Sequence, residues 1–171
     1  MSNSRPSRIS LIGMPGSGKS TVGVLLAKRI GLAFVDTDIL IQEQEQATLA
    51  EIIARSNAFA LREIEEQVLL DMPITDSVIS TGGSVVYSPA IMARLSAASA
   101  VVYLRAQLET VDYRISLAPD RGIASPGNHT LEDVYNERAP RYEQYSDLVV
   151  DVDHDTPEAI TGQIIAQLDT L

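Results

Sequence analysis

The segment that most constrains this chain is 13–20, GMPGSGKS, which fits the pattern G-x-x-x-x-G-K-[ST]. It follows an apolar run at 9–13 and precedes a stretch at 18–30 whose apolar residues recur on one helical face up to Gly31. Strand, glycine-rich turn and helix in this order bring backbone N–H groups and a helix N-terminus onto one phosphate. The motif therefore predicts a nucleoside triphosphate site rather than a turn that only starts a helix.

Each part of this loop has an expected role. We expect Lys19 to reach the β- and γ-phosphate oxygens, and the Ser20 hydroxyl to ligate Mg²⁺. The pattern that reads guanine in GTPases, N-K-x-D, is absent, so a small-molecule kinase fits this length best. The predicted nucleotide-binding residues of the loop are Gly13, Gly16, Ser17, Gly18, Lys19, Ser20 and Thr21.

The rest of the chain alternates short apolar runs with longer amphipathic segments. Further strands are predicted at 32–35, 78–80, 101–104 and 148–152, and helices at 38–44, 47–56, 59–71 and 157–169. Short, wholly apolar strands separated by helices indicate a parallel sheet that is covered on both faces. We predict one α/β domain of 171 residues, with three layers and a five-stranded parallel sheet.

The longest stretch without periodicity, 117–129, is rich in proline, glycine and serine. Loops of this length inside compact domains are uncommon and are often active-site lids, although a surface insertion is the alternative. We expect a mobile lid at about 114–129 and acceptor-binding helices within 37–72. The core is then made by 8–36, 74–112 and 146–171.

Charge and composition exclude several classes of protein. The chain carries 23 acidic and 13 basic residues, a net charge of −10, so it repels a polyanion and no nucleic-acid partner is expected. It has no cysteine, no apolar run long enough to cross a membrane and no apolar signal segment near residue 1. These features favour a cytoplasmic protein without membrane contact, which we expect to be a monomer.

Two acidic residues follow the second predicted strand. The carboxyl ends of parallel strands form a binding crevice, and residues at i and i+2 of an extended chain point the same way, so Asp36 and Asp38 can both face the phosphates. One would serve a metal and the other would orient an acceptor hydroxyl. The alternative is a helix N-cap with a second acid that the helix dipole favours.

From residue 9 to the last helix, the chain resembles the shikimate kinases, small P-loop NTPases that phosphorylate a hydroxyl of shikimate in aromatic amino acid biosynthesis. The resemblance rests on GMPGSGKST (13–21), FVDTD (34–38), LREIEE (61–66), ISTGG (79–83), an arginine at 121 and ERAPRY (137–142). It implies ATP as co-substrate, Mg²⁺ as cofactor and a small hydroxy acid as the other partner.

The resemblance also implies residue roles. Ser20 and Asp36 would serve the metal, and Asp38 would hold ring hydroxyls of the acceptor. Arg62 and Arg138 would grip the substrate carboxylate, with Glu65 behind them, although each arginine taken alone fits an exposed salt bridge. The remaining implied roles are backbone approach to the ligand at Gly82 and Gly83, phosphate binding in the closed lid by Arg121, and adenine stacking by Arg114.

Three departures from the family pattern fall on the acceptor and lid side. Ser84 stands where a third glycine is usual and is expected to add bulk beside the ligand; Gly122-Ile123-Ala124 follows the lid arginine; and Asn57-Ala58 replaces a Gly-Glu pair, with Leu61 before Arg62. They leave two alternatives open. One is a paralogous kinase for another small hydroxy acid or amino alcohol, such as homoserine or a sugar acid, and the other is a catalytically silent nucleotide-binding regulator.

Overall fold

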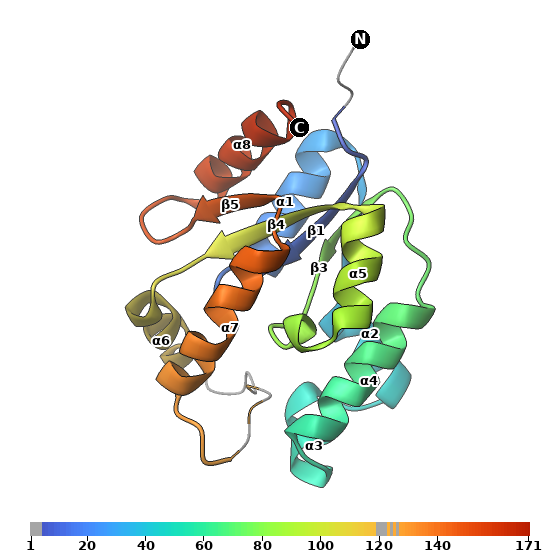
Figure 1. The fold of residues 1–171 in the computed structure, drawn as a ribbon, viewed down its shortest axis with the longest axis vertical. Helices are drawn as coiled ribbons and strands as arrows, with labels where there is room; N and C mark the ends of the chain where they lie inside the picture. Colours follow the sequence, from blue (N-terminus) through green and yellow to red (C-terminus); the bar gives the residue numbers. More distant parts are fainter. Residues whose placement is uncertain (1–4, 119–122, 124, 126) are drawn as a thin grey trace.

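The structure is a computed structural model that describes residues 5–118, 123, 125 and 127–171 (Figure 1). Its strands are β1 (Arg8–Ile12), β2 (Ala33–Asp36), β3 (Ser77–Ser80), β4 (Ala100–Arg105) and β5 (Leu148–Asp151). Its helices are α1 (Lys19–Ile30), α2 (Thr37–Glu45), α3 (Leu49–Arg55), α4 (Ala58–Asp71), the 3₁₀ turn η1 (Val85–Tyr87), α5 (Pro89–Ala98), α6 (Leu108–Ser116), α7 (Leu131–Tyr145) and α8 (Pro157–Leu168). Each predicted element is present within a few residues of its predicted bounds.

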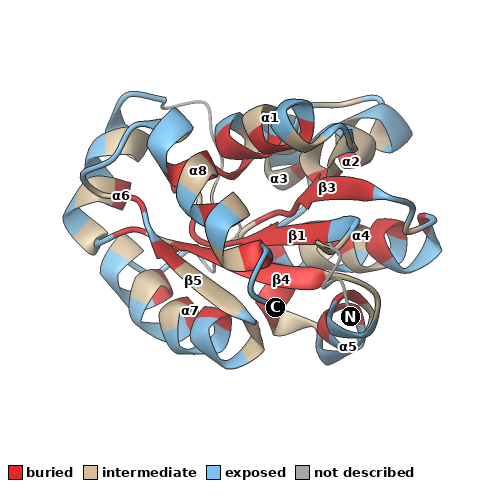
Figure 2. Ribbon diagram, turned by 90° about the horizontal axis from the view of Figure 1, so that it is seen from above, coloured by how far each residue is buried: buried red, intermediate tan, exposed pale blue. Residues whose placement is uncertain are grey.

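The five strands form one sheet in the order β2-β3-β1-β4-β5, and every neighbouring pair is parallel. Helices α1 and α8 lie on one face of the sheet, and α5 and α7 lie on the other (Figure 2). The central strands are buried on both sides, which explains why their sequences are apolar without alternation. The predicted three-layer fold is confirmed.

The strand order makes β1 the topological switch point. The chain runs from β1 out to β2 and back to β3, then crosses β1 to reach β4 and β5 on its other side. Ligands bind at the carboxyl ends of the strands at such a point. Here the loop between β1 and α1, with the phosphate-binding motif, occupies that position.

Local signals in the sequence explain where several helices begin and end. Helix α1 starts after Gly18 (φ 93°) and ends at Gly31 (φ 73°), two positions in the left-handed region that favours glycine. Thr156 caps α8, whose first residue is Pro157. In α4 the Asn57 side chain accepts a hydrogen bond from the Ala60 N–H (2.9 Å). One residue of the Asn57-Ala58 departure is therefore a helix cap.

Helices α2, α3 and α4 pack around a small apolar core of their own, separate from the main core beside the sheet. Its buried members are Ile41, Ile52, Ala58, Leu61 and Val68. In Figure 1, α3 and α4 lie at the end of the molecule opposite the C-terminus. This arrangement presents one edge of the three-helix unit to the loops that follow the strands.

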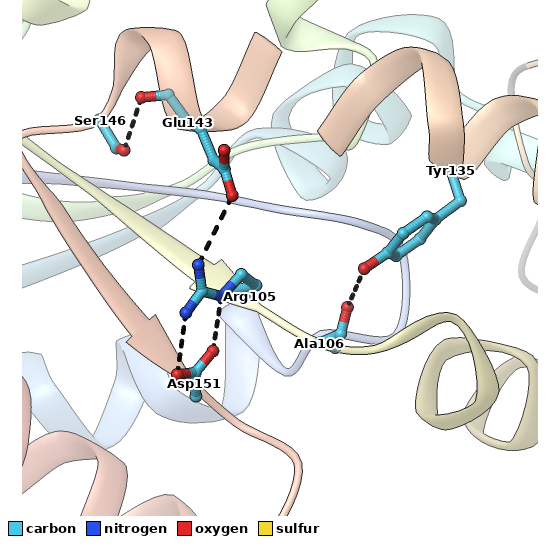
Figure 3. A network of polar contacts seen from close by, with 6 residues as sticks. All are labelled: Arg105, Ala106, Tyr135, Glu143, Ser146 and Asp151. Carbon is cyan, nitrogen blue, oxygen red and sulfur yellow. Dashed lines mark hydrogen bonds and ion pairs between the residues drawn. The ribbon is translucent and has the colours of Figure 1, made fainter. Parts of the chain in front are cut away.

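Polar contacts on the surface join β4, β5 and α7 (Figure 3). The Arg105 guanidinium makes a two-pronged ion pair with Asp151 (2.6 and 3.0 Å) and also reaches Glu143 (3.5 Å). The Tyr135 hydroxyl donates to the Ala106 carbonyl (2.9 Å). Because Arg105 is about one-third exposed, this network contributes little to stability. Within the described ranges, no helix is both long and apolar enough to cross a membrane.

Candidate active site

A cavity of about 390 Å³ lies where the β1–α1 loop, the start of α2, α4, the loop after β3, α6, α7 and the start of α8 meet. A volume of this size suits a small-molecule site. The predicted site residues that line it are Gly16, Ser17, Gly18, Lys19, Ser20, Thr21, Asp38, Gly82, Gly83, Arg114 and Arg138. Gly13, Asp36 and Arg62 are not among the residues that line it, and Arg121 is outside the described residues.

The Lys19 side chain bonds back to the phosphate-binding loop that carries it. Lys19 is 8% exposed, and its Nζ donates to the carbonyls of Gly13 (2.8 Å) and Met14 (2.9 Å). Gly13 has φ 149°, and a Cβ there would stand 2.7 Å from the Leu104 carbonyl oxygen. The loop can therefore follow this path only with glycine at 13. The bonds to Gly13 and Met14 hold the Lys19 ammonium group against the backbone of the same loop.

Asp36 joins the phosphate-binding loop to the acceptor side. Its Oδ2 accepts from the Ser20 hydroxyl (2.6 Å), and its Oδ1 accepts from the Asp38 N–H (3.0 Å), which caps α2. Both interpretations of Asp36, cap and metal-site residue, are therefore compatible. A hydroxyl and a carboxylate in contact are hard oxygen donors, which suit Mg²⁺.

Asp38 lies in a helix, so the prediction that extended backbone turns it toward the site was wrong. Asp36 ends β2, but Asp38 lies in the first turn of α2, so strand alternation does not relate the two side chains. It is the helical turn that brings Asp38 to the cavity. There its Oδ1 stands 3.2 Å from the position that a Cβ on Gly82 would take.

Gly82 and Gly83 are constrained by what surrounds them. A Cβ on Gly82 would collide with Oε1 of Glu65, and a Cβ on Gly83 would stand 2.7 Å from Pro15 Cδ and 3.0 Å from an Arg138 nitrogen. The Gly82 N–H donates to the Thr37 hydroxyl (3.2 Å), and the Gly83 carbonyl accepts from the Tyr142 hydroxyl. This close packing brings the β3–η1 loop against both α4 and α7.

Ser84, the departure at the third glycine, lines the cavity, and its hydroxyl is turned toward α4. Its hydroxyl donates to Oε2 of the buried Glu65, whereas Oε1 accepts no hydrogen bond within the described part of the chain. Burial raises the pKa of Glu65 to about 7; the Ser84 hydrogen bond lowers it, the Asp38 charge raises it, and the charges of Arg138 and Lys19 lower it. The Ser84 side chain is thus bonded to α4 while it lines the cavity, and its effect on the bound acceptor stays a prediction.

The two arginines predicted for the acceptor meet at one tyrosine. Arg138 is 1% exposed, which rules out an exposed salt bridge, and its Nε donates to the Tyr87 hydroxyl (3.3 Å). The Arg62 guanidinium carbon lies 3.8 Å from the centre of the Tyr87 ring, while the neighbouring Glu66 carboxylate accepts from Ser88 (2.5 Å). The structure thus brings Arg62 and Arg138 together at Tyr87, and Arg138 also lines the cavity.

Arg114 links the phosphate-binding loop to the segment that follows β5. It donates to the Gly16 carbonyl (3.1 Å) and to the Val152 carbonyl (3.0 Å) after β5. Asp155 and Pro157, from the β5–α8 connection, line the same cavity. Thr37, Tyr87 and Tyr142, which bond to the β3–η1 loop or to Arg138, were not predicted as site residues. Thr37 and Tyr142 lie within the FVDTD and ERAPRY segments, whereas nothing in the local pattern marks Tyr87.

A phosphate-binding loop at the switch point of a parallel sheet, with acidic and arginine side chains in one cavity, defines a P-loop phosphotransferase of the small-molecule kinase type. The family model for shikimate kinase matches residues 15–169. The chain belongs to the shikimate kinase family and is a phosphotransferase that acts on a hydroxyl group.

Individual relatives agree with this assignment. A shikimate kinase of Paracidovorax citrulli is 35% identical over 163 residues, which are 92% of this chain and 89% of the relative. Among solved structures, shikimate kinase from Acinetobacter baumannii in complex with shikimate matches with a TM-score of 0.88 at 25% identity, over 98% of this chain and 95% of that one. Shikimate kinase from Aquifex aeolicus matches with a TM-score of 0.79 at 27% identity, over 95% and 96% of the two chains.

Proposed function

We propose that this chain transfers the γ-phosphoryl group of ATP to a hydroxyl of shikimate and forms shikimate 3-phosphate. The observation that carries the proposal is that one cavity is lined both by the phosphate-binding loop and by Asp38, Gly82, Gly83 and Arg138. Donor and acceptor would meet inside it without a diffusing intermediate. Positioning and charge neutralisation supply most of the catalysis in phosphoryl transfer.

On the nucleotide side, the N–H groups of 16–21 and the α1 N-terminus would hold the phosphates, with Arg114 beside the adenine. Lys19 would exchange its bonds to Gly13 and Met14 for the phosphate oxygens. Ser20 and Asp36 would hold Mg²⁺, which when bound neutralises phosphate charge. This pair is already in contact and needs little rearrangement.

On the acceptor side, Arg62 and Arg138 would bind the carboxylate, since guanidinium groups match carboxylates in two-pronged geometry. Asp38 would accept a hydrogen bond from the attacking hydroxyl and take its proton as the new O–P bond forms. The bond from the γ-phosphorus to ADP then breaks. Arg121, in a lid over about 114–129, would add positive charge to the transferring group, and the closed lid would exclude water.

The test is a steady-state assay of ATP-dependent phosphorylation with shikimate, homoserine and a sugar acid as acceptors. We expect kcat/KM for shikimate to exceed that for the others by at least about 100-fold, because buried hydrogen-bonding groups reject acceptors that leave them unpaired. Lys19→Ala is the control and should lose turnover. If the enzyme prefers another of these compounds, that compound replaces shikimate as the proposed acceptor. Nucleotide binding without turnover of any acceptor would favour a silent regulator.

We further propose that the enzyme acts as a cytoplasmic monomer that engages neither nucleic acid nor membranes. A net charge of −10 opposes association with polyanions, and a chain without cysteine suits a reducing compartment. Size-exclusion chromatography with light scattering tests the monomer.

A further inference from the structure

We infer that Tyr87 is a positioning residue for acceptor recognition, because its ring and hydroxyl hold the guanidinium groups of Arg62 and Arg138 where an anionic acceptor enters. This inference rests on the proposed function of the two arginines as carboxylate ligands. Tyr87 is the last residue of η1, three residues after Ser84, and it lies between α4 and α7.

Three guanidinium groups surround this one ring. Their central carbons stand 3.8 Å (Arg62), 5.2 Å (Arg138) and 5.2 Å (Arg141) from its centre. All three lie within the distance at which the negative face of an aromatic ring attracts a cation. Like charges gathered this closely repel each other, so the ring offsets part of the cost of concentrating them.

An aromatic partner suits this position better than a carboxylate would. The Glu65 carboxyl already interacts electrostatically with Arg138, and a second carboxylate at position 87 would compete with the acceptor's own carboxylate for N–H donors. For Arg62, whose guanidinium carbon lies 3.8 Å from the ring centre, attraction to the ring itself consumes no N–H donor. The Tyr87 hydroxyl adds orientation, since it accepts from Nε of the buried Arg138 (3.3 Å).

The backbone that carries Tyr87 is fixed on two sides. Toward α4, the Ser84 hydroxyl bonds to Glu65 and the Ser88 hydroxyl bonds to Glu66. Toward α7, the Tyr142 hydroxyl bonds to the Gly83 carbonyl. The ring is therefore a rigid support between one helix that supplies Arg62 and another that supplies Arg138 and Arg141. In a chain of net charge −10, this cluster also makes a local positive region for an anionic acceptor.

The test compares Tyr87→Phe, which keeps the ring, with Tyr87→Leu, which removes it. Tyr113→Leu, at a 65% exposed tyrosine on α6, is the matched control. We expect Tyr87→Leu to raise KM for shikimate by about ten-fold or more, with kcat and KM for ATP within about two-fold of the parent. Tyr87→Phe should stay within about three-fold of the parent, and Tyr113→Leu should match it.

A second measurement separates recognition of the carboxylate from general damage to the fold. The parent and each variant are assayed with shikimate and with its methyl ester, which lacks the negative charge. The preference for the acid should fall about ten-fold in Tyr87→Leu and persist in Tyr87→Phe. An unchanged preference in Tyr87→Leu, or an equal loss in Tyr87→Phe, would overturn the inference. Failure of the parent to phosphorylate shikimate would instead reject the proposed function.

Discussion

Removing the Ser84 hydroxyl should destabilise the protein by an amount that depends on pH. The hydroxyl donates to Oε2 of Glu65, a carboxyl that is 3% exposed and has a pKa raised by burial to about 7 from an ordinary 4.5. A raised carboxyl pKa means that the folded state favours the protonated form. The stability due to this group is therefore fully present below about pH 4.5 and is lost as the pH rises through about 7.

The hydrogen bond from Ser84 acts against this loss because it stabilises the ionised carboxylate. A hydrogen bond to a charged group contributes about 1.5–3 kcal/mol, and one between neutral groups about 0.5–1.5 kcal/mol. Ser84→Ala should thus lower the free energy of unfolding by roughly 1 kcal/mol more at about pH 9 than at about pH 5. The pKa of Glu65 should accordingly be about one unit higher in Ser84→Ala than in the parent, because one pKa unit corresponds to about 1.4 kcal/mol.

Urea unfolding of the parent and Ser84→Ala at both pH values measures this difference. The same substitution in a Glu65→Gln background is the control, because glutamine does not ionise and the penalty should then be equal at both pH values. An equal penalty with Glu65 present would refute the reasoning. The Ser84 hydrogen bond would then be no stronger to the ionised carboxylate than to the protonated carboxyl.

Two other substitutions test the geometry of the cavity. Gly82→Ala places a Cβ against Oε1 of Glu65 and close to Asp38, so kcat/KM for the acceptor should fall about ten-fold or more. The affinity for ADP, measured by calorimetry, should stay the same. Weakened ADP binding would contradict this prediction. Asp36→Asn keeps an N-cap for α2 but loses the charge that faces Ser20, so half-maximal activity should need about ten-fold more Mg²⁺ at unchanged thermal stability. An unaltered Mg²⁺ requirement would remove Asp36 from the metal site.

Most of the fold could be predicted because its signals are local. A continuous apolar run gives a buried parallel strand, Gly31 ends α1, and Thr156 with Pro157 starts α8. The phosphate-binding loop is a contiguous motif between two such elements. Each of these inferences needs only neighbouring residues.

What the sequence could not provide depends on contacts between distant elements. Tyr87 meets Arg138 across 51 positions of the chain, and Ser84 meets Glu65 across 19. The bond from Ser84 to a buried carboxylate depends on where α4 packs. For Asp38 the predicted location in the cavity was correct, although the extended backbone assumed for it was wrong.

The central claim is that one cavity brings ATP and the acceptor together for direct transfer. Single-turnover reactions with γ-labelled ATP, shikimate and an excess of enzyme test it most directly, because they follow the label itself. We predict that the label appears in shikimate 3-phosphate at the rate at which ATP disappears, with no labelled inorganic phosphate formed first. Label released mainly to water, or ATP left intact with shikimate present, would contradict the account.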